Sequence, residues 1–443
     1  MKPDAQVASM CAQGHAGEGS LARRVAVALT LSLAFIVTAV PGAALGKTAP
    51  PPSIAVDLLK KPMFFYVAKG EPNACGPGCN EWIAAEGTFD LAVAARLRAF
   101  LSKPRNRNLP IYFYSPGGLA DHAFSVGRIL RERGMTAGVS RTLLDACKTL
   151  DEKACSALKR SGQTLTAELN PIASCNSACV YALIGAKERR VPPGARLGVH
   201  SGKLLLMKID QQGRVVSVQS SSAKSRMDAF DARTRKYIAE MGIDTKLYDI
   251  ASSVPHESGR YLSRDEIAAL KIDARGFQET GWMLVPSQRA AVRKLFIEAK
   301  GPEHKEYRVS VVDFSCGGSS SIQLAYIRGL SSDEGSGAEI SGLVVDGKEI
   351  LMLRLKPAAF KLDVVDPGAS FDRWDRFEPI EFLEALAKQD SLEIGAGRSG
   401  RRLAAMSVKL STAGLASAIG ALRTKCGSAD PYSPAMKPSG ATQ

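Results

Sequence analysis

Histidine is scarce in this sequence: only five of its 443 residues are histidines, at positions 15, 122, 200, 256 and 304. So few imidazoles leave few bases for chemistry at neutral pH. Runs of like charge are also missing, since no block of five forms although the formal net charge is +14. Because the excess is scattered and no basic stretch is interleaved with aromatic residues, we expect a solvated basic surface and no nucleic-acid partner.

An uncharged apolar run, residues 25–40, follows two arginines and precedes small residues with A-x-A-like spacing. A positive flank, an apolar core and a small-residue cleavage site form the layout of a secretory signal. The alternative is an uncleaved membrane anchor over residues 25–45, whose length approaches that of a spanning helix. In both cases residues 1–46 direct export, so we expect a protein that is periplasmic or anchored at the outer face of the inner membrane.

The cysteine count agrees with export. Cys11 precedes the apolar run, and an even number of cysteines remains beyond it, which predicts disulfides in an oxidising compartment. Three pairs are local and the last two cysteines are far apart: Cys75 and Cys79, Cys147 and Cys155, Cys175 and Cys179, and Cys316 and Cys426. The alternative is a four-thiolate zinc site from the two C-x-x-x-C pairs. Exported cysteines more often pair with each other, so we expect no metal and no cofactor.

Strands alternate with helices in a first region, residues 54–300, which follows a proline-rich linker over 47–53. This alternation predicts βαβ units and a mainly parallel sheet, so the expected fold class is α/β. The expected strands are 81–89, 110–116 and 135–140, and the expected helices are 90–103, with Asp90 as N-cap, and 122–134, with Gly134 as its stop. A polar segment, 141–172, carries two cysteines, and we interpret it as an insertion held by a disulfide.

The rest of the chain divides into the end of this region and a second one. The first region continues with a strand over 194–202, a hairpin over 204–220, a helix over 224–242 and a capping box from Ser263 to Glu266. The second region, residues 301–430, mixes strand-like and helix-like segments, so we expect a smaller α+β domain with mostly antiparallel neighbours. Residues 431–443 are rich in Pro, Ser and Gly, and we expect a disordered tail.

Three short stretches combine residue types that suit acyl-transfer chemistry. Ser115–Gly118 and Ser177 each stand at an apparent strand-to-helix turn, and His200 ends a short apolar strand. A serine becomes a nucleophile when a base takes its proton, and His200 is the candidate base for Ser177. The oxyanion that forms needs two N–H donors. Ala178, which follows Ser177, supplies one donor and the Gly-Gly turn supplies another. The plainer alternative for Ser177 is a helix N-cap.

These motifs resemble the ClpP/crotonase superfamily, and within it the exported ClpP-like proteins of bacteria. The resemblance covers about residues 78–285 and depends on the order and spacing of EWIAAEGTF, YSPGGLADHAFSVGRILRERG, CNSACVYALIGAKERRVPPGARLGVHS and YLSRDEIAALKID. It implies stacked ββα units, with Ser177 as catalytic serine and His200 as catalytic histidine. It also implies an oxyanion hole from the N–H groups of Gly118 and Ala178, and strand-like binding of an extended peptide after the Gly-Gly turn.

The acid that would complete a catalytic triad is missing from its expected place. In Clp-type proteases the triad aspartate lies just before the residues that match Tyr261–Ser263, and that position here is Gly259. Glu257 is the nearest candidate acid, and Asp249 and Asp265 are further candidates. The site is therefore a Ser–His dyad, a triad with a shifted acid, or a decayed site. If Glu257 is not the triad acid, we interpret it, together with His256, as part of a loop.

Two functions remain open. The first is an exported serine hydrolase that cleaves peptide bonds in a peptide or protein substrate. The second is a catalytically decayed ClpP-like scaffold that binds peptides or protein partners in the periplasm. Crotonase-like acyl-CoA chemistry is disfavoured, because export would remove the enzyme from that substrate. Clp-type relatives assemble as rings through the helix that matches 224–242, so the resemblance also implies a homo-oligomer.

Overall fold

The structure is a computed structural model that describes residues 61–211, 215–285, 290–300, 306–317, 321–330, 338–355 and 371–426. The expected signal or anchor, the linker and the C-terminal tail lie outside these ranges. Within these ranges, no helix is long and apolar enough to cross a membrane. The candidate anchor over 25–45 is not among the residues to which this finding applies.

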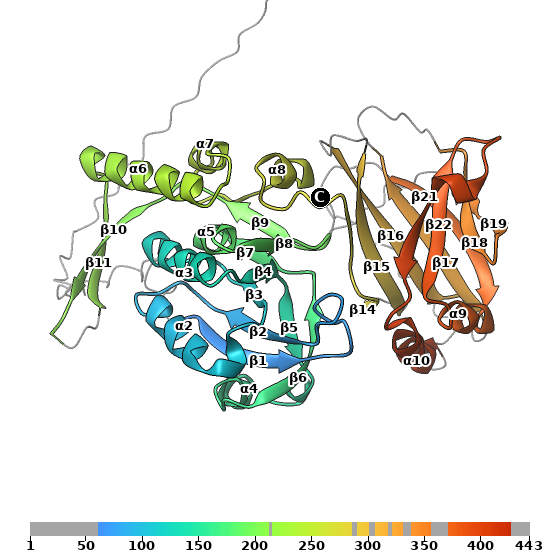
Figure 1. Cartoon of the computed structure of the whole chain (residues 1–443), viewed down its shortest axis with the longest axis horizontal. Coiled ribbons are helices and arrows are strands. Elements are labelled where there is room, and N and C mark those ends of the chain that lie inside the picture. The colour runs from blue at the N-terminus through green and yellow to red at the C-terminus, as the bar shows by residue number, and fades with distance from the viewer. Residues whose placement is uncertain are drawn as a thin grey trace, which may run out of the picture. The chain divides into compact units, whose positions relative to one another are not determined.

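A seven-stranded, mostly parallel sheet forms the centre of the first region, in the order β5-β6-β1-β2-β3-β4-β8 (Figure 1). Its strands are β1 (Phe64–Lys69), β2 (Glu81–Glu86), β3 (Ile111–Tyr114), β4 (Thr136–Val139), β5 (Arg141–Leu144), β6 (Thr164–Asn170) and β8 (Glu188–Arg190). Strands β2, β3, β4 and β8 run parallel to one another, whereas β1 pairs with β2 in the antiparallel direction. The mixed α/β class predicted from the alternation of strands and helices is therefore confirmed.

Helices cover one face of this sheet. Helix α2 (Val93–Ser102) and helix α3 (Ala120–Glu132) pack their apolar sides on residues such as Ile83 and Phe113. The alternate residues, including Trp82 and Tyr112, face a second cluster on the other side, as the two-residue period of a strand requires.

The predicted N-cap of α2 is wrong. The helix begins after Ala92, not after Asp90, and the Ala92 side chain makes no capping bond. Asp90 instead accepts a hydrogen bond from the Ala92 N–H at 2.9 Å and binds the guanidinium of Arg96. Burial pushes the pKa of Asp90 upward, but the bonds from Arg96 and Ala92 hold it below the ordinary value. An ion pair with Arg96, six residues along the chain, has therefore replaced the expected capping bond.

The segment 141–172 is part of the main sheet. Strands β5 and β6 pair with each other, and β6 extends the sheet beyond β1. Between them lie a short 3-10 helix, η2 (Ala146–Lys148), and α4 (Glu152–Lys159), joined by the disulfide Cys147–Cys155. The expected insertion thus completes a sheet edge and the second apolar cluster.

A second layer holds the strand β7 (Ser174–Asn176), the helix α5 (Ala178–Ile184) and the strands β9 (Arg196–Val199) and β12 (Arg260–Tyr261). Helix α5 crosses α3 at a point where both helices carry glycine. A Cβ on Gly185 would lie 2.2 Å from the Gly127 Cα, so no larger residue fits without separating the helices. This close crossing holds the C-terminal end of α5, the helix that follows Ser177, against α3.

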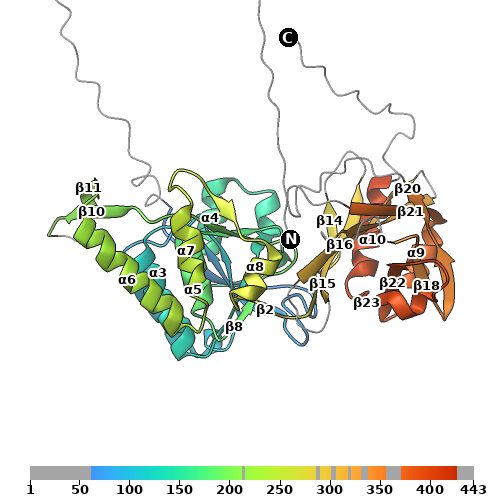
Figure 2. The ribbon, with the colours of Figure 1, turned by 90° about the horizontal axis from the view of Figure 1, so that it is seen from above.

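The remaining elements of the first region are β10 (Leu204–Ile209), β11 (Val215–Ser221), α6 (Lys224–Glu240), α7 (Lys246–Ser253) and α8 (Arg264–Ala269). The predicted capping box is confirmed, because Ser263 and Glu266 exchange both bonds at the start of α8. The buried residues of α6, including Tyr237, lie in its C-terminal half. Figures 1 and 2 show the β10–β11 ribbon beside the other end of this helix.

The C-terminal part consists of antiparallel strands with two helices, α9 (Ile380–Leu386) and α10 (Leu415–Cys426). One sheet contains β13 (Phe277–Glu279), β14 (Met283–Val285), β15 (Ala291–Lys300), β16 (Glu306–Cys316), β17 (Ser321–Gly329), β21 (Phe371–Pro379) and β20 (Leu353–Leu355). The other contains β19 (Lys348–Leu351), β18 (Ile340–Val345), β22 (Ser391–Gly397) and β23 (Ser407–Ser411), with the 3-10 helix η3 (Leu403–Met406) beside it.

The predicted boundary at residue 300 needs correction. Strand β15 pairs with β16 along its whole length, and β13 and β14 pair with β15. Residues 277–300 therefore belong with the C-terminal strands and not with the first region. The disulfide Cys316–Cys426 joins the end of β16 to the end of α10.

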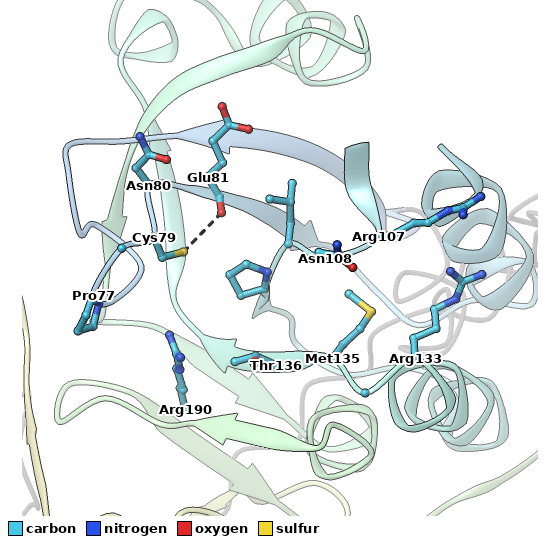
Figure 3. A pocket seen from close by; sticks show the side chains of 14 residues that line it. Pro77, Cys79, Asn80, Glu81, Arg107, Asn108, Arg133, Met135, Thr136 and Arg190 are labelled. Atoms are coloured by element: carbon cyan, nitrogen blue, oxygen red, sulfur yellow. Dashed lines mark hydrogen bonds between the residues drawn. The ribbon is translucent and has the colours of Figure 1, made fainter. Parts of the chain in front are cut away.

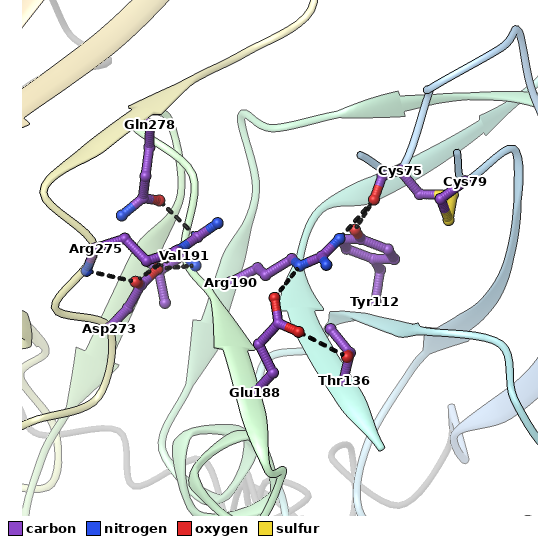
Figure 4. A network of polar contacts seen from close by, with 10 residues as sticks. All are labelled: Cys75, Cys79, Tyr112, Thr136, Glu188, Arg190, Val191, Asp273, Arg275 and Gln278. Carbon is purple, nitrogen blue, oxygen red and sulfur yellow. Dashed lines mark hydrogen bonds and ion pairs between the residues drawn. A yellow bond between two sulfur atoms is a disulfide. The ribbon is translucent and has the colours of Figure 1, made fainter. Parts of the chain in front are cut away.

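A buried carboxylate, Asp273, ties β8 to the segment after α8 (Figure 4). It is 3% exposed and accepts the Val191 N–H at 2.8 Å, while the guanidinium of Arg275 binds both of its oxygens at 2.7–2.9 Å. The guanidinium nitrogen Nη2 of Arg264 lies 3.6 Å from Asp273 Oδ1. Burial alone would raise the pKa of Asp273, but the hydrogen bonds from Arg275 and the two positive charges hold this pKa below the ordinary aspartate value.

We expect Asp273→Asn to lower the free energy of unfolding at neutral pH by about 3 kcal/mol, because it leaves the buried guanidinium of Arg264, and the more exposed one of Arg275, without their anionic partner. The lowered pKa means that the stabilisation from Asp273 is complete above about pH 4, the range of an unfolded aspartate, and is lost as pH falls through the folded-state pKa. Denaturant unfolding of both proteins across acidic pH should show their difference shrinking. Asp145→Asn, whose pair with Lys148 is exposed, should change stability by at most about 1 kcal/mol.

Candidate active site

Two parallel strands bring Ser177 and His200 to the same edge. Asn176 of β7 lies opposite Gly198 of β9, and the Ser177 N–H donates to the Gly198 carbonyl at 2.7 Å. His200 follows β9 directly, two residues beyond Gly198. Because both strands run in the same direction, the two predicted residues leave the sheet at its carboxyl edge together.

The backbone of Ser177 is strained. Its φ is 54° and its ψ is −119°, in a region that residues with a Cβ rarely adopt. Ser177 occupies the N-cap position of α5, yet its side chain makes no capping bond. The hydroxyl also makes no hydrogen bond with any other residue that the structure describes. The plainer interpretation, a serine held for helix capping, therefore does not account for this residue.

The Gly-Gly turn lies directly against Ser177. A Cβ on Gly117 would stand 2.9 Å from the Ser177 Cβ and 3.5 Å from the Ala178 nitrogen. Gly117 has φ 112° and Gly118 has φ 139°, values that suit only glycine. The turn therefore needs both of its glycines. Gly117 is needed also because a side chain there would collide with Ser177.

Two amides near Ser177 are available to a ligand. Phe89 binds the Gly117 carbonyl and the Leu119 N–H, at 2.9 and 2.7 Å. Since successive amides of an extended chain point to opposite sides, the Gly118 N–H points away from Phe89. The Ala178 N–H is the first of α5 and has no partner inside the helix. Neither amide donates to any described residue, so both of the predicted oxyanion donors are unoccupied within that part of the chain.

A disulfide brackets the turn at Ser177. Cys175 in β7 and Cys179 in α5 are bonded, with their Cα atoms 5.2 Å apart, and both are fully buried. Together with Cys75–Cys79, Cys147–Cys155 and Cys316–Cys426, this bond uses all eight cysteines that the structure describes. The alternative of a four-thiolate zinc site is therefore wrong, because a disulfide sulfur is not a thiolate ligand.

His200 is oriented by a backbone carbonyl. Its Nδ1 lies 2.9 Å from the Ser201 oxygen. A carbonyl can only accept, so the bond places the proton of the neutral ring on Nδ1 and leaves the Nε2 lone pair free to act as a base. No hydrogen bond joins His200 to Ser177 among the described residues.

The candidate acids do not contact His200 by any bond in the described residues. Asp249 binds Arg235 at 2.7 Å. Glu257 is exposed and has no hydrogen-bond or ion-pair partner among the described residues. His256, interpreted from the sequence as a loop residue, lies near this site, with its Nδ1 3.0 Å from the same Ser201 oxygen. The scarcity of histidine was the one signal that could have drawn attention to it.

A cavity of about 560 Å³ lies elsewhere (Figure 3). It is lined at the amino ends of β2, β3 and β4 by residues that include Glu81, Pro110 and Thr136. Ser115–Gly118 follow the opposite, carboxyl end of β3. This cavity is therefore separate from the serine and histidine, and its Arg190 is already bound to Glu188 and to the Cys75 carbonyl.

No protein-family model matches the chain, and no curated protein matches it either. Among solved structures, a serine-to-alanine mutant of the 1510-N membrane-bound stomatin-specific protease is 14% identical, with a TM-score of 0.28, over 43% of this chain and 75% of its own. A second mutant of that protease, in complex with a substrate peptide, has the same identity and TM-score over 43% and 71%. A ClpP1 mutant from Listeria monocytogenes is 12% identical, with a TM-score of 0.25, over 42% and 84%.

The strain at Ser177 makes a testable difference between two small substitutions. Ser177→Gly should have a free energy of unfolding about 1 kcal/mol higher than Ser177→Ala, because glycine adopts this φ and ψ without strain. Chemical denaturation of both variants measures the difference. At Ser174, in the extended strand β7, the order should reverse, since glycine weakens a strand. Equal stability of the two Ser177 variants would show that the backbone there is relaxed.

Removing the disulfide beside Ser177 should weaken the fold. We expect the double variant Cys175→Ala, Cys179→Ala to lose about 2 kcal/mol in free energy of unfolding, the chain-entropy value for so short a loop. The matched control is the double variant of Cys75 and Cys79, which closes a loop of the same length. A loss of serine reactivity only in the first variant would show that Cys175–Cys179 also holds the site geometry.

Proposed function

We propose that this chain is an exported serine hydrolase that cleaves peptide bonds with Ser177 as nucleophile and His200 as general base. The observation that carries the proposal is the strained backbone at Ser177, which presents a hydroxyl not used for capping. Strain of this kind persists where the surrounding structure requires it, and it is common at nucleophile turns between a strand and a helix. The order of motifs that resembles ClpP-like proteins supports the same assignment.

The reaction begins when His200 Nε2 takes the proton from the Ser177 hydroxyl. The Ser177 Oγ then attacks the peptide carbonyl, and the negative charge develops on the carbonyl oxygen. The N–H groups of Gly118 and Ala178 stabilise this oxyanion. His200 gives its proton to the leaving amine as the C–N bond breaks, and water then hydrolyses the acyl-enzyme by the same steps.

Binding of an extended peptide is supported by the backbone at Gly118. Residues 117–119 use one side of their backbone to pair with Phe89. The other side, with the N–H of Gly118, has no partner in the described part of the chain, so a substrate strand could pair there. Attachment to a membrane through residues 25–45 and assembly as a homo-oligomer belong to the same proposal, as expectations from sequence.

The second candidate function is a decayed scaffold that binds peptides or protein partners without cleaving them. It is favoured by one observation: among the described residues, His200 donates to no carboxylate and makes no hydrogen bond with Ser177. In that case the same Gly118 edge would hold the partner, and the serine would be a remnant.

A fluorophosphonate probe distinguishes the two functions. We expect the purified protein to be labelled on Ser177, Ser177→Ala to be unlabelled, and His200→Ala to react about 10³-fold more slowly, because the general base is gone. Labelling of both wild type and Ser177→Ala would mean that another residue reacts. No labelling of the wild type, combined with retained peptide binding, would assign the scaffold function.

A further inference from the structure

Ser201 is held from both sides by the segment that follows α7. Its N–H donates to the Val254 carbonyl at 2.8 Å. Its carbonyl lies 3.0 Å from His256 Nδ1, across 55 residues of sequence, and 2.9 Å from His200 Nδ1. A carbonyl oxygen has two lone pairs, so the two imidazole N–H groups saturate it. The position of the Ser201 peptide is therefore set by residues 254–256.

The two histidine rings also contact each other. Their centroids are 4.7 Å apart and the ring planes meet at 89°, an edge-to-face arrangement that aromatic pairs prefer. His200 and His256 are both half-buried, whereas Glu257 is exposed. Each ring donates Nδ1 to the same acceptor, so both neutral rings carry the same tautomer. Rotation of His200 would break its bond to Ser201 and its packing against His256 together.

We propose that His256 is a positioning residue that substitutes for the missing triad acid by fixing the Ser201 carbonyl and the ring of His200. In a Ser-His-Asp triad the carboxylate accepts from Nδ1 and holds the tautomer and the ring orientation. Here the acceptor is the Ser201 oxygen, and His256 holds that acceptor in place. The expected effect of His256 on the reaction rate rests on the proposed function. The expected effect of His256 on the tautomer of His200 does not.

The first test does not require catalysis. ¹⁵N chemical shifts of the His200 imidazole, recorded above neutral pH, report which ring nitrogen carries the proton. We expect the Nδ1–H tautomer in the wild-type protein and a mixture of tautomers in His256→Ala. A wild-type His200 with its proton on Nε2 would overturn the proposal, whatever the variants do. This readout remains valid if Ser177 proves unreactive, so failure of the proposed function can be told apart.

The second test separates hydrogen bonding from packing at position 256. Asn keeps an N–H donor near the place of Nδ1, Phe keeps a ring without a donor, and Ala removes both. We expect the rate of fluorophosphonate labelling of Ser177 to fall on the order of 10²-fold in His256→Ala, the effect of a small misplacement of a catalytic group. His256→Asn should retain most of the wild-type rate, and His256→Phe should be as slow as His256→Ala.

Each other result counts against the proposal. An unchanged labelling rate in His256→Ala would overturn it, and so would a loss in His256→Asn equal to the loss in His256→Ala. A slow rate in Glu257→Gln with a wild-type rate in His256→Ala would assign the role to the neighbouring carboxylate. If His256→Ala does not fold, His256→Asn against His256→Phe at equal thermal stability decides the question.

Discussion

The backbone of Ser177 is the constraint on which the rest of the site depends. Its conformation is unfavourable for a residue with a Cβ, so it needs support from several directions. The N–H bond to Gly198 joins it to β9, and Gly117 leaves just enough room for it on the side of β3. The Cys175–Cys179 disulfide closes the same turn. The bond to β9, the turn at Gly117 and the disulfide to α5 therefore all fix the position of the Ser177 hydroxyl.

That placement explains why small residues gather around it. Gly117 and Gly118 are needed for the turn itself, while Gly127 and Gly185 let α3 and α5 cross in contact. A side chain at Gly185 would push the end of α5 away from α3, and one at Gly127 would first meet the Tyr237 hydroxyl of α6, 1.8 Å from the added Cβ. Glycines therefore let backbone groups come close together at this site, and these backbone groups make up more of the site than polar side chains do.

Local features could be predicted from sequence, and features that depend on distant partners could not. The capping box of α8 and the stop at Gly134 need only neighbouring residues, so their patterns were sufficient. Asp90 is an exception with a near partner: it was misassigned because Arg96, six residues along the chain, binds its carboxylate, and an acidic residue before a helix looks the same in the sequence whether it caps the helix or forms an ion pair. The boundary at residue 300 was wrong because β15 pairs with β16, which follows it in the chain, and no residue pattern in the sequence indicates which sheet a strand will join. The contact of His256 with Ser201 spans 55 residues and has no local signature.

The disulfides have a consequence for how the chain matures. Three of them join cysteines four to eight residues apart, and the fourth joins cysteines 110 residues apart. Eight cysteines allow roughly a hundred pairings. Since the chain emerges from its N-terminus, each local partner follows its cysteine almost at once, and the three short bonds can close before Cys426 exists. Oxidation in order of emergence would leave Cys316 and Cys426 as the last pair among the eight cysteines that the structure describes, so the order of emergence would select the correct pairing without an isomerase.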